Sequence, residues 1–232
     1  INPAKGLVTL KTTANELPSI LSLIPCSVIS AKPISTRIEE ILNGYFNDGT
    51  LKSCVEHFLL RQRPSFTLDH GKDLSKLADN TIDSLIIAIG SLDESYFCIQ
   101  GPPGTGKTYS GARVINSLVE KGMKVGIASN SHKAINNMLE AVISHMDEEK
   151  ITGLVGKVHN KNDDLLYENK RILLSKTPKD MPLSDVSVVG GTAWTFSNEH
   201  FQDSLDYLFI DEAGQVSLAN MIGMSSSCKN II

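Results

Sequence analysis

The sequence has little of what would place a protein in a membrane or attract it to nucleic acid by charge alone. Its 22 Lys and Arg residues are outnumbered by 26 Asp and Glu residues, and the net charge of −4 gives no overall basic field. Any contact with nucleic acid must therefore come from a local patch. The longest apolar runs, such as residues 85–89, fall far short of the roughly 20 residues that a membrane-spanning helix needs. We expect a soluble protein without a membrane partner.

Cysteine is scarce as well. The four cysteines stand at positions 26, 54, 98 and 228, with no Cys-x-x-Cys pair and no zinc spacing. This usage is typical of a reduced compartment, and no signal peptide is visible, so we expect a cytoplasmic protein with buried or idle thiols. The first residue is Ile1 rather than Met, from which we expect a fragment of a longer chain.

The chain contains no repeat, and its pattern changes near residue 70. Pro64 breaks a helical pattern there, because proline lacks a backbone donor. We therefore predict an N-terminal accessory segment over residues 1–70 and a main domain over residues 71–232. In the first segment, prolines interrupt short apolar runs before two stretches of helical spacing. We predict loops and short strands over residues 1–34, a helix over 35–45 capped by Ser35 or Thr36, and a helix over 51–59.

The main domain alternates between apolar strands and amphipathic helices. Near-continuous apolar strands separated by helices are typical of a parallel sheet with helices on both faces. The predicted fold class is therefore α/β. The predicted strands span residues 96–100, 124–128, 154–158, 186–189 and 206–210, and the predicted helices span 74–89, 107–121 and 132–146.

A glycine-rich loop follows the first of these strands and matches the pattern G-x-x-x-x-G-K-[ST]. Its glycines let the backbone curl so that several N–H groups face phosphate oxygens, and the next helix adds its positive N-terminus. Lys107 would reach the β- and γ-phosphates, and the Thr108 hydroxyl would bind Mg²⁺. The predicted nucleotide-binding residues are Gly101, Pro102, Pro103, Gly104, Thr105, Gly106, Lys107 and Thr108.

A second signal lies about a hundred residues later, where an apolar strand ends in Asp211 and Glu212. Alone, such a pair is usually a solvated turn. Beside a phosphate loop, Asp211 would hold Mg²⁺ and Glu212 would orient and deprotonate the attacking water. Neighbouring side chains at a strand end point in different directions, so the two carboxylates can serve the metal and the nucleophile separately. The sequence thus predicts an ATPase in which Lys107 and Glu212 are catalytic.

These motifs, together with the segment 129–137 between them, resemble the first motor domain of superfamily 1B helicases. The nonsense-mediated-decay RNA helicase and the replication nuclease-helicase belong to that group. The middle segment is most similar to bacterial proteins that join a RecB-like nuclease to such a helicase. The resemblance covers about residues 71–232. It implies a P-loop NTPase with a RecA-like sheet, which uses ATP and Mg²⁺ to move on single-stranded DNA or RNA.

The resemblance also assigns roles outside the phosphate loop. Gln215 would sense the γ-phosphate during catalysis, with a surface glutamine on a turn as the alternative. For His132, capping or packing is an equal alternative to nucleic-acid contact. For Trp194, burial against the sheet is favoured over stacking on a base. The residues that would contact single-stranded nucleic acid are Ser129, Asn130, Ser131, His132, Thr192 and Trp194.

Two departures from the family pattern leave questions open. Relatives carry a glutamine upstream of the phosphate loop that reads adenine, whereas this chain has none between Gln62 and Gln100. Base selectivity is therefore open. In the family, residues like 229–232 begin a strand that inserts between the strand of the phosphate loop and the strand of the carboxylates. We expect truncation here, a gap at the centre of the sheet and unpaired backbone groups on both neighbours.

The expected partners are therefore a second RecA-like domain, which supplies arginines in relatives, and a nuclease domain upstream. Without those arginines the fragment alone should hydrolyse ATP very slowly, since such a residue contributes about 10³- to 10⁵-fold in related reactions. Two other classes of protein compete with this interpretation. A small-molecule kinase would need an arginine-rich lid that the sequence lacks. A regulatory or scaffolding P-loop ATPase would bind nucleotide without moving along nucleic acid.

Overall fold

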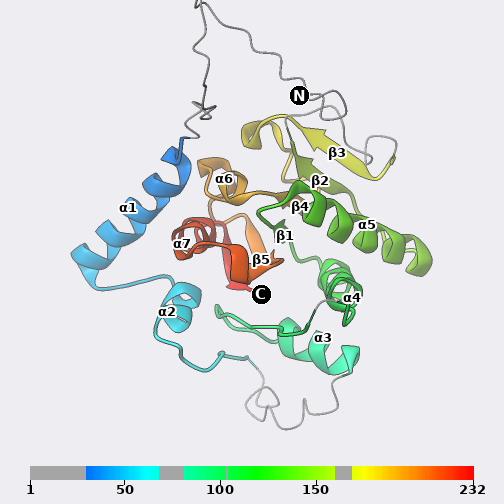
Figure 1. Cartoon of the computed structure of the whole chain (residues 1–232), viewed down its shortest axis with the longest axis horizontal. Helices are drawn as coiled ribbons and strands as arrows, with labels where there is room; N and C mark the ends of the chain where they lie inside the picture. The colour runs from blue at the N-terminus through cyan, green and yellow to red at the C-terminus, as the bar shows by residue number, and fades with distance from the viewer. Residues whose placement is uncertain (1–29, 68–80, 103, 160–168) are drawn as a thin grey trace, which may run out of the picture. The chain divides into compact units, whose positions relative to one another are not determined.

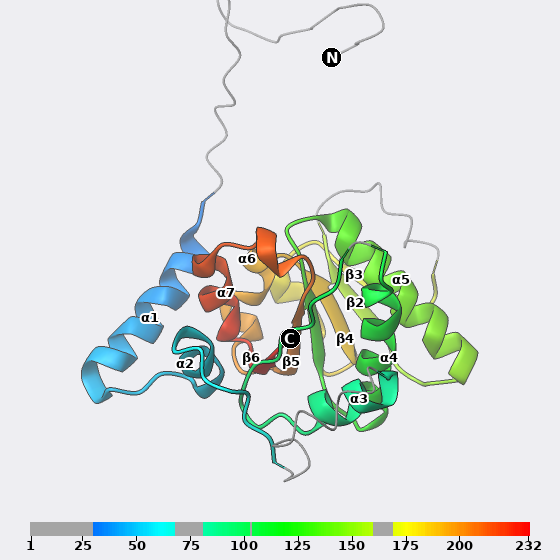
Figure 2. The same ribbon diagram turned by 60° about the horizontal axis from the view of Figure 1, so that its bottom comes forward.

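The computed structural model describes residues 30–67, 81–102, 104–159 and 169–232 (Figures 1 and 2). Residues Ala31–Ile232 form one compact unit. None of the helices in these ranges is long and apolar enough to cross a membrane.

The unit is built on a six-stranded sheet in which every pairing between the described strands is parallel. The strand order is β3-β2-β4-β1-β5-β6, so strands distant in sequence lie side by side. This arrangement confirms the predicted α/β class. The strands are β1 (Val125–Ala128), β2 (Val155–Val158), β3 (Ile172–Ser175), β4 (Val188–Gly191), β5 (Leu205–Ile210) and β6 (Cys228–Ile231).

Four predicted strands are confirmed as β1, β2, β4 and β5, with β4 starting two residues later than expected. The strand expected to open at 229–232 is also present as β6. Strand β3 was not predicted, because its apolar run is short and half exposed, a pattern that a loop can share.

The predicted strand over residues 96–100 is wrong. The chain makes only a single parallel bridge there, between Tyr96 and Ile231, with the Phe97 N–H donating to the Ile231 carbonyl at 2.8 Å. The other edge of β6 pairs in parallel with β5. The Ile232 N–H there donates to the Leu208 carbonyl at 2.9 Å. The prediction of a gap is therefore wrong, because β6 lies there and pairs with β5, and the single bridge at Tyr96 does not extend into a strand over residues 97–100.

Helices cover both faces of the sheet, as the alternating pattern predicted (Figures 1 and 2). One buried apolar cluster joins α3, α4 and α5 to the sheet, and a second joins α1, α2, α6 and α7 to its other face. The helices are α1 (Lys32–Asp48), α2 (Ser53–Leu59), α3 (Ile82–Gly90), α4 (Lys107–Glu120), α5 (His132–Glu149), α6 (Ala193–Phe196) and α7 (Leu218–Ser225), with 3₁₀ turns η5 (Pro178–Asp180), η6 (Glu199–Phe201) and η7 (Ala213–Gln215).

The two N-terminal helices pack within this unit. The predicted cap at Ser35 or Thr36 is wrong, because α1 begins at Lys32 and has a proline in its first turn. Ile34 of α1 and Cys54 of α2 are buried in the cluster that includes Met221 and Met224 of α7. The accessory role of residues 1–70 stays a prediction.

Helices α4 and α5 confirm their predicted spans, although α5 continues three residues further. Of the predicted helix 74–89, the structure describes the end as α3, whose N-cap Thr81 accepts a hydrogen bond from the Ser84 N–H. Residues 74–80 lie outside the described ranges. Helix α3 packs beside α4 and so stands next to the phosphate loop.

Candidate nucleotide-binding site

The phosphate loop has the backbone geometry that its glycines permit. Gly104 and Gly106 have φ angles of 82° and 80°, in the left-handed region that residues with a Cβ rarely adopt. At Gly101 a Cβ would lie 2.6 Å from Oγ1 of Thr105, so the loop closes tightly on itself. Pro103, also predicted for this site, lies outside the described residues.

The start of α4 completes this loop. Gly106 is its N-cap and offers no side-chain acceptor, so the first backbone N–H groups of α4 are available to an anion. The Lys107 ammonium donates to the carbonyls of Gly101 at 2.6 Å and Pro102 at 3.0 Å. Thr108 is exposed in the first turn of α4. These donors fit a polyphosphate chain.

The carboxylate pair follows β5. The Asp211 N–H donates to the Ala128 carbonyl at 2.8 Å, which holds this residue against the end of β1. The Asp211 carboxylate accepts from the Glu212 N–H at 3.0 Å. Glu212 is exposed and has a φ of 55°, a left-handed conformation that costs a non-glycine residue about 1 kcal/mol or more. Such strain is concentrated at functional sites.

A cavity of about 280 Å³ joins the two motifs. Gly101 and Lys107 line it from the phosphate loop, and Asp211, Glu212 and Gly214 line it from the segment after β5. The structure thus brings the predicted lysine and both predicted carboxylates to one cavity. Thr108 is not part of its lining.

This donor set also fits a magnesium ion bound with a nucleotide. Mg²⁺ is usually held by one or two protein oxygens together with substrate phosphates rather than by a complete protein cage. Within the described ranges, no group of three or more His, Cys, Asp or Glu residues could hold a metal ion. The Asp211 carboxylate lines the cavity and could share such an ion with phosphate, whereas a contribution from the Thr108 hydroxyl stays a prediction.

A larger cavity of about 530 Å³ lies between the phosphate loop and α3, and sequence reasoning missed it. Its walls combine apolar side chains with neutral hydroxyl and amide groups, and Lys107 lines it as well as the first cavity. The available signal in the sequence was Thr81 followed by apolar residues, which indicates the start of the helix that forms one wall of this cavity. The lining residues are Thr81, Ile82, Ser84, Leu85, Ala88, Phe97, Ile99, Gln100, Gly101, Pro102, Thr105, Lys107 and Ser110.

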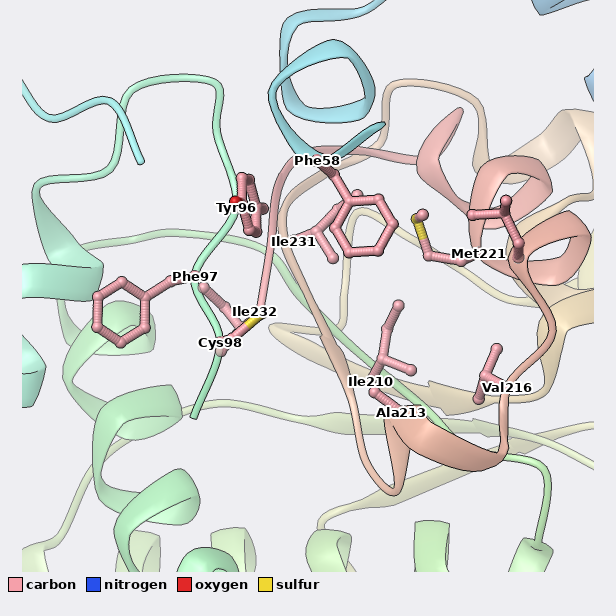
Figure 3. A pocket seen from close by; sticks show the side chains of 11 residues that line it. Phe58, Tyr96, Phe97, Cys98, Ile210, Ala213, Val216, Met221, Ile231 and Ile232 are labelled. Carbon is pink, nitrogen blue, oxygen red and sulfur yellow. The ribbon is translucent and has the colours of Figure 1, made fainter. Parts of the chain in front are cut away.

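A third cavity, of about 200 Å³, is almost wholly apolar (Figure 3). Phe58 of α2, Tyr96 and Met221 of α7 form part of its wall, and Ala213 and Val216 border it from the segment after β5. Apart from Tyr96 and Cys98, its lining side chains are apolar. It does leave one side of η7 without close packing.

The first segment expected to contact nucleic acid divides into buried and exposed members. Ser129 is only 3% exposed. Its hydroxyl oxygen accepts a hydrogen bond from the Ser131 N–H, with 3.4 Å between the oxygen and the nitrogen. Asn130, Ser131 and His132 are exposed. The N-cap of α5 is Ser131 rather than His132, and the Ser131 hydroxyl accepts a hydrogen bond from the Ala134 N–H.

The side chains of this segment also contact the protein itself. The His132 ring packs edge-on against the His159 ring at 4.6 Å between centroids. The Asn130 amide donates to the Gln215 carbonyl at 2.6 Å. That last contact joins two predicted functional segments, and sequence reasoning missed it.

The second expected segment is largely packed. Thr192 is half-buried as the N-cap of α6, and Trp194 is half-buried against the apolar cluster of α6 and α7. This packing agrees with the alternative favoured for Trp194, burial against the sheet. Gly191 fits here because a Cβ would lie 2.6 Å from the Thr195 side chain.

Comparison with known proteins identifies a family and several similar proteins. A profile described as "AAA domain" matches residues 84–230. The DNA replication ATP-dependent helicase/nuclease DNA2 of Saccharomyces cerevisiae is 30% identical over 133 residues, which is 56% of this chain and 9% of that protein. The human DNA2 is 27% identical over 138 residues, 57% of this chain and 13% of that protein. JHS1 of Arabidopsis thaliana, which carries the same description, is 28% identical over 131 residues, 56% of this chain and 10% of that protein.

The chain spans about a tenth of the length of these curated relatives. The similarity supports a P-loop domain of the superfamily 1 helicase type. The matched residues 84–230 include the phosphate loop and the carboxylate pair and make up more than half of the sequence. This chain therefore belongs to the AAA domain family.

Proposed function

We propose that this chain is the first RecA-like motor domain of a superfamily 1B helicase or translocase that acts on single-stranded DNA or RNA. The observation that carries the proposal is the cavity lined by both Lys107 and the Asp211–Glu212 pair, since hydrolysis of a nucleoside triphosphate needs a phosphate ligand and a base in one place. The names of the similar proteins, which are ATP-dependent helicase/nucleases, support the same class of activity.

The predicted site residues each have a role in this proposal, and Lys107, Asp211 and Glu212 are the ones among them that share the cavity as its lining side chains. MgATP, when bound, supplies the phosphoanhydride bond to be cleaved and a cation that neutralises phosphate charge. Lys107 and the N–H groups at the start of α4 bind the β- and γ-phosphates. Thr108 and Asp211 hold the ion. Glu212 orients and deprotonates the attacking water, and Gln215 senses the γ-phosphate.

The cavity between α3 and the phosphate loop supports binding of the nucleoside. Its apolar walls suit a base and its hydroxyls suit a sugar. The exposed residues Asn130, Ser131 and His132 at the end of β1 would face the nucleic acid. A second RecA-like domain would supply arginine to the phosphates, and a nuclease domain upstream would complete an enzyme of the RecB-like fusion type.

The deciding experiment measures ATP hydrolysis by the full-length protein with and without single-stranded DNA or RNA. We expect stimulation by one of the polymers, and a loss of at least 100-fold in Lys107→Ala. Lys179→Ala is the matched control, because Lys179 on η5 lines none of the three cavities. Hydrolysis that neither polymer stimulates would favour the regulatory or scaffolding ATPase and contradict the motor.

A further inference from the structure

The ends of β1 and β5 lie side by side, and each leads into a segment with a predicted role. Ala128 pairs with Ile210 at the last position of the parallel ladder. The Asp211 N–H continues the ladder by donating to the Ala128 carbonyl at 2.8 Å. Parallel pairing therefore places the expected nucleic-acid segment, which begins at Ser129, directly beside the expected nucleotide segment, which ends at Gln215.

One side chain bridges these two segments. The Asn130 Nδ2 donates to the backbone carbonyl of Gln215 at 2.6 Å. A carbonyl only accepts hydrogen bonds, so this contact defines which end of the Asn130 amide faces η7. Asn130 is exposed, and a hydrogen bond of this kind contributes on the order of 1 kcal/mol to stability. The fold does not depend on it.

The turn that receives this bond is held loosely. None of the three residues of η7 is buried. Ala213 borders the apolar cavity (Figure 3) and also the cavity shared with Lys107, so η7 adjoins two cavities. In the part of the chain that the structure describes, no other hydrogen bond reaches Ala213–Gln215 from another element. The Asn130 amide is therefore the group from another element that holds the Gln215 carbonyl, in addition to the backbone hydrogen bonds of the turn itself.

We infer that Asn130 is a positioning residue that couples nucleotide binding to nucleic-acid binding through its hydrogen bond to Gln215. The inference rests on the proposed function. A shift of η7 toward or away from the γ-phosphate stretches or shortens the bond, and so moves Asn130 and the exposed residues beside it. By linkage, nucleotide and single strand must change one another's affinity by the same factor.

The test measures this factor directly in the full-length protein. The affinity for a fluorescent single-stranded oligonucleotide is measured with and without a non-hydrolysable ATP analogue. Coupled sites typically change affinity by about 5- to 150-fold, and we expect the wild type to fall in this range. In Asn130→Ala the ratio of the two affinities should fall to within about twofold of one. Asn130→Asp keeps the side-chain size but removes the donor, so it should lose coupling as well.

Ser131→Ala is the matched control. It removes a helix-capping contact in the same exposed segment but leaves the bond between Asn130 and Gln215 intact. We expect the affinity for the single strand to fall while the ratio stays at its wild-type value. A purely structural or contact role for Asn130 would give that same result in Asn130→Ala and would overturn the inference.

A second readout separates the two proposals. At saturating single strand, the rate of ATP hydrolysis by Asn130→Ala should fall about tenfold or more, because the bound strand no longer acts on the nucleotide site through Gln215. If single strand stimulates hydrolysis by the wild type but Asn130→Ala keeps the wild-type coupling, the inference about Asn130 is contradicted and the proposed function is not. No stimulation in the wild type would contradict the proposed function itself.

Discussion

The phosphate loop and the segments expected to contact nucleic acid are built in different ways. The loop depends on backbone conformation, with Gly104 and Gly106 in the left-handed region and Lys107 opening α4. The other segments depend on side chains whose exposure is set by their neighbours, so Ser129 is buried and Trp194 is half packed. A backbone site can be recognised from local residue types, whereas a side-chain surface requires knowledge of what packs against it.

The largest effect should come from the nucleotide-binding site, when Glu212, the proposed general base, is replaced. Glu212→Gln should lower the rate of ATP hydrolysis by about 10²- to 10⁴-fold and leave ATP affinity nearly unchanged, because the amide keeps the shape but cannot accept a proton. Single-turnover hydrolysis and equilibrium nucleotide binding in the full-length protein measure the two effects. Glu148→Gln on α5, which lines neither cavity beside the phosphate loop, is the control. A matching loss of affinity would mean that Glu212 holds the nucleotide instead.

The next largest effect should come from Trp194, in one of the segments expected to contact nucleic acid. Trp194→Ala should lower the free energy of unfolding by about 2 kcal/mol, since it removes a half-buried ring from the cluster of α6 and α7. Chemical denaturation measures this change. The affinity for a single strand should respond more to His132→Ala, whose side chain is exposed. Unchanged stability with a large loss of strand affinity in Trp194→Ala would instead show that the ring stacks on a base.

A smaller effect is expected when the loop backbone is crowded. Gly101→Ala places a Cβ where the Thr105 Oγ1 lies 2.6 Å away, so the Thr105 hydroxyl must move and its hydrogen bond to the Pro102 carbonyl, 2.8 Å long, is disturbed. We expect ATP affinity to fall about tenfold, or ~1.4 kcal/mol. Gly44→Ala is the control, because its Cβ meets nothing within 4 Å on helix α1 and should stabilise the protein slightly. Unchanged ATP affinity in Gly101→Ala would show that the loop tolerates a side chain there.

The smallest expected effect concerns Asp206, at the opposite end of β5 from Asp211 and Glu212. Burial acts to raise the pKa of Asp206, but hydrogen bonds from the Lys229 ammonium at 2.8 Å and the Lys124 N–H at 2.9 Å outweigh it and hold the pKa below its usual value. A depressed folded pKa adds stability above the unfolded pKa of about 3.9, and this stability is lost as the pH falls through the folded value.

Asp206→Asn should therefore lower stability by about 0.5 kcal/mol at neutral pH, with the difference from wild type shrinking below about pH 4. Denaturation curves at pH 7 and pH 3 test this. Asp185→Asn is a suitable control, since its carboxylate accepts from the hydroxyl of its sequence neighbour Ser184 and, within the described residues, forms no ion pair. A pH-independent difference would assign the effect to packing rather than to charge.

The predictions of two helices and of the strand before the carboxylates were confirmed because they depend on local properties of the sequence. The amphipathic periods of residues 107–121 and 132–146 correspond to α4 and α5, and the carboxylate pair does follow a buried strand. The strand expected over residues 96–100 failed for a long-range reason, because a strand needs a ladder of pairs with a neighbour and only the single bridge between Tyr96 and Ile231 forms there. The cap of α1 failed because Pro33 already supplies a favourable first turn.

The sequence by itself determined the phosphate loop, the carboxylates and the alternation of strands and helices. Positive φ angles and apolar periodicity are encoded within a few residues, so they can be recognised without a structure. Only the tertiary structure decided that Lys107 and Glu212 share a cavity, that Ser129 is buried and that Asn130 reaches Gln215. These facts follow from the strand order, which places β1 beside β5 across some eighty residues of sequence, and pairing over that distance is set by the packing of the whole sheet.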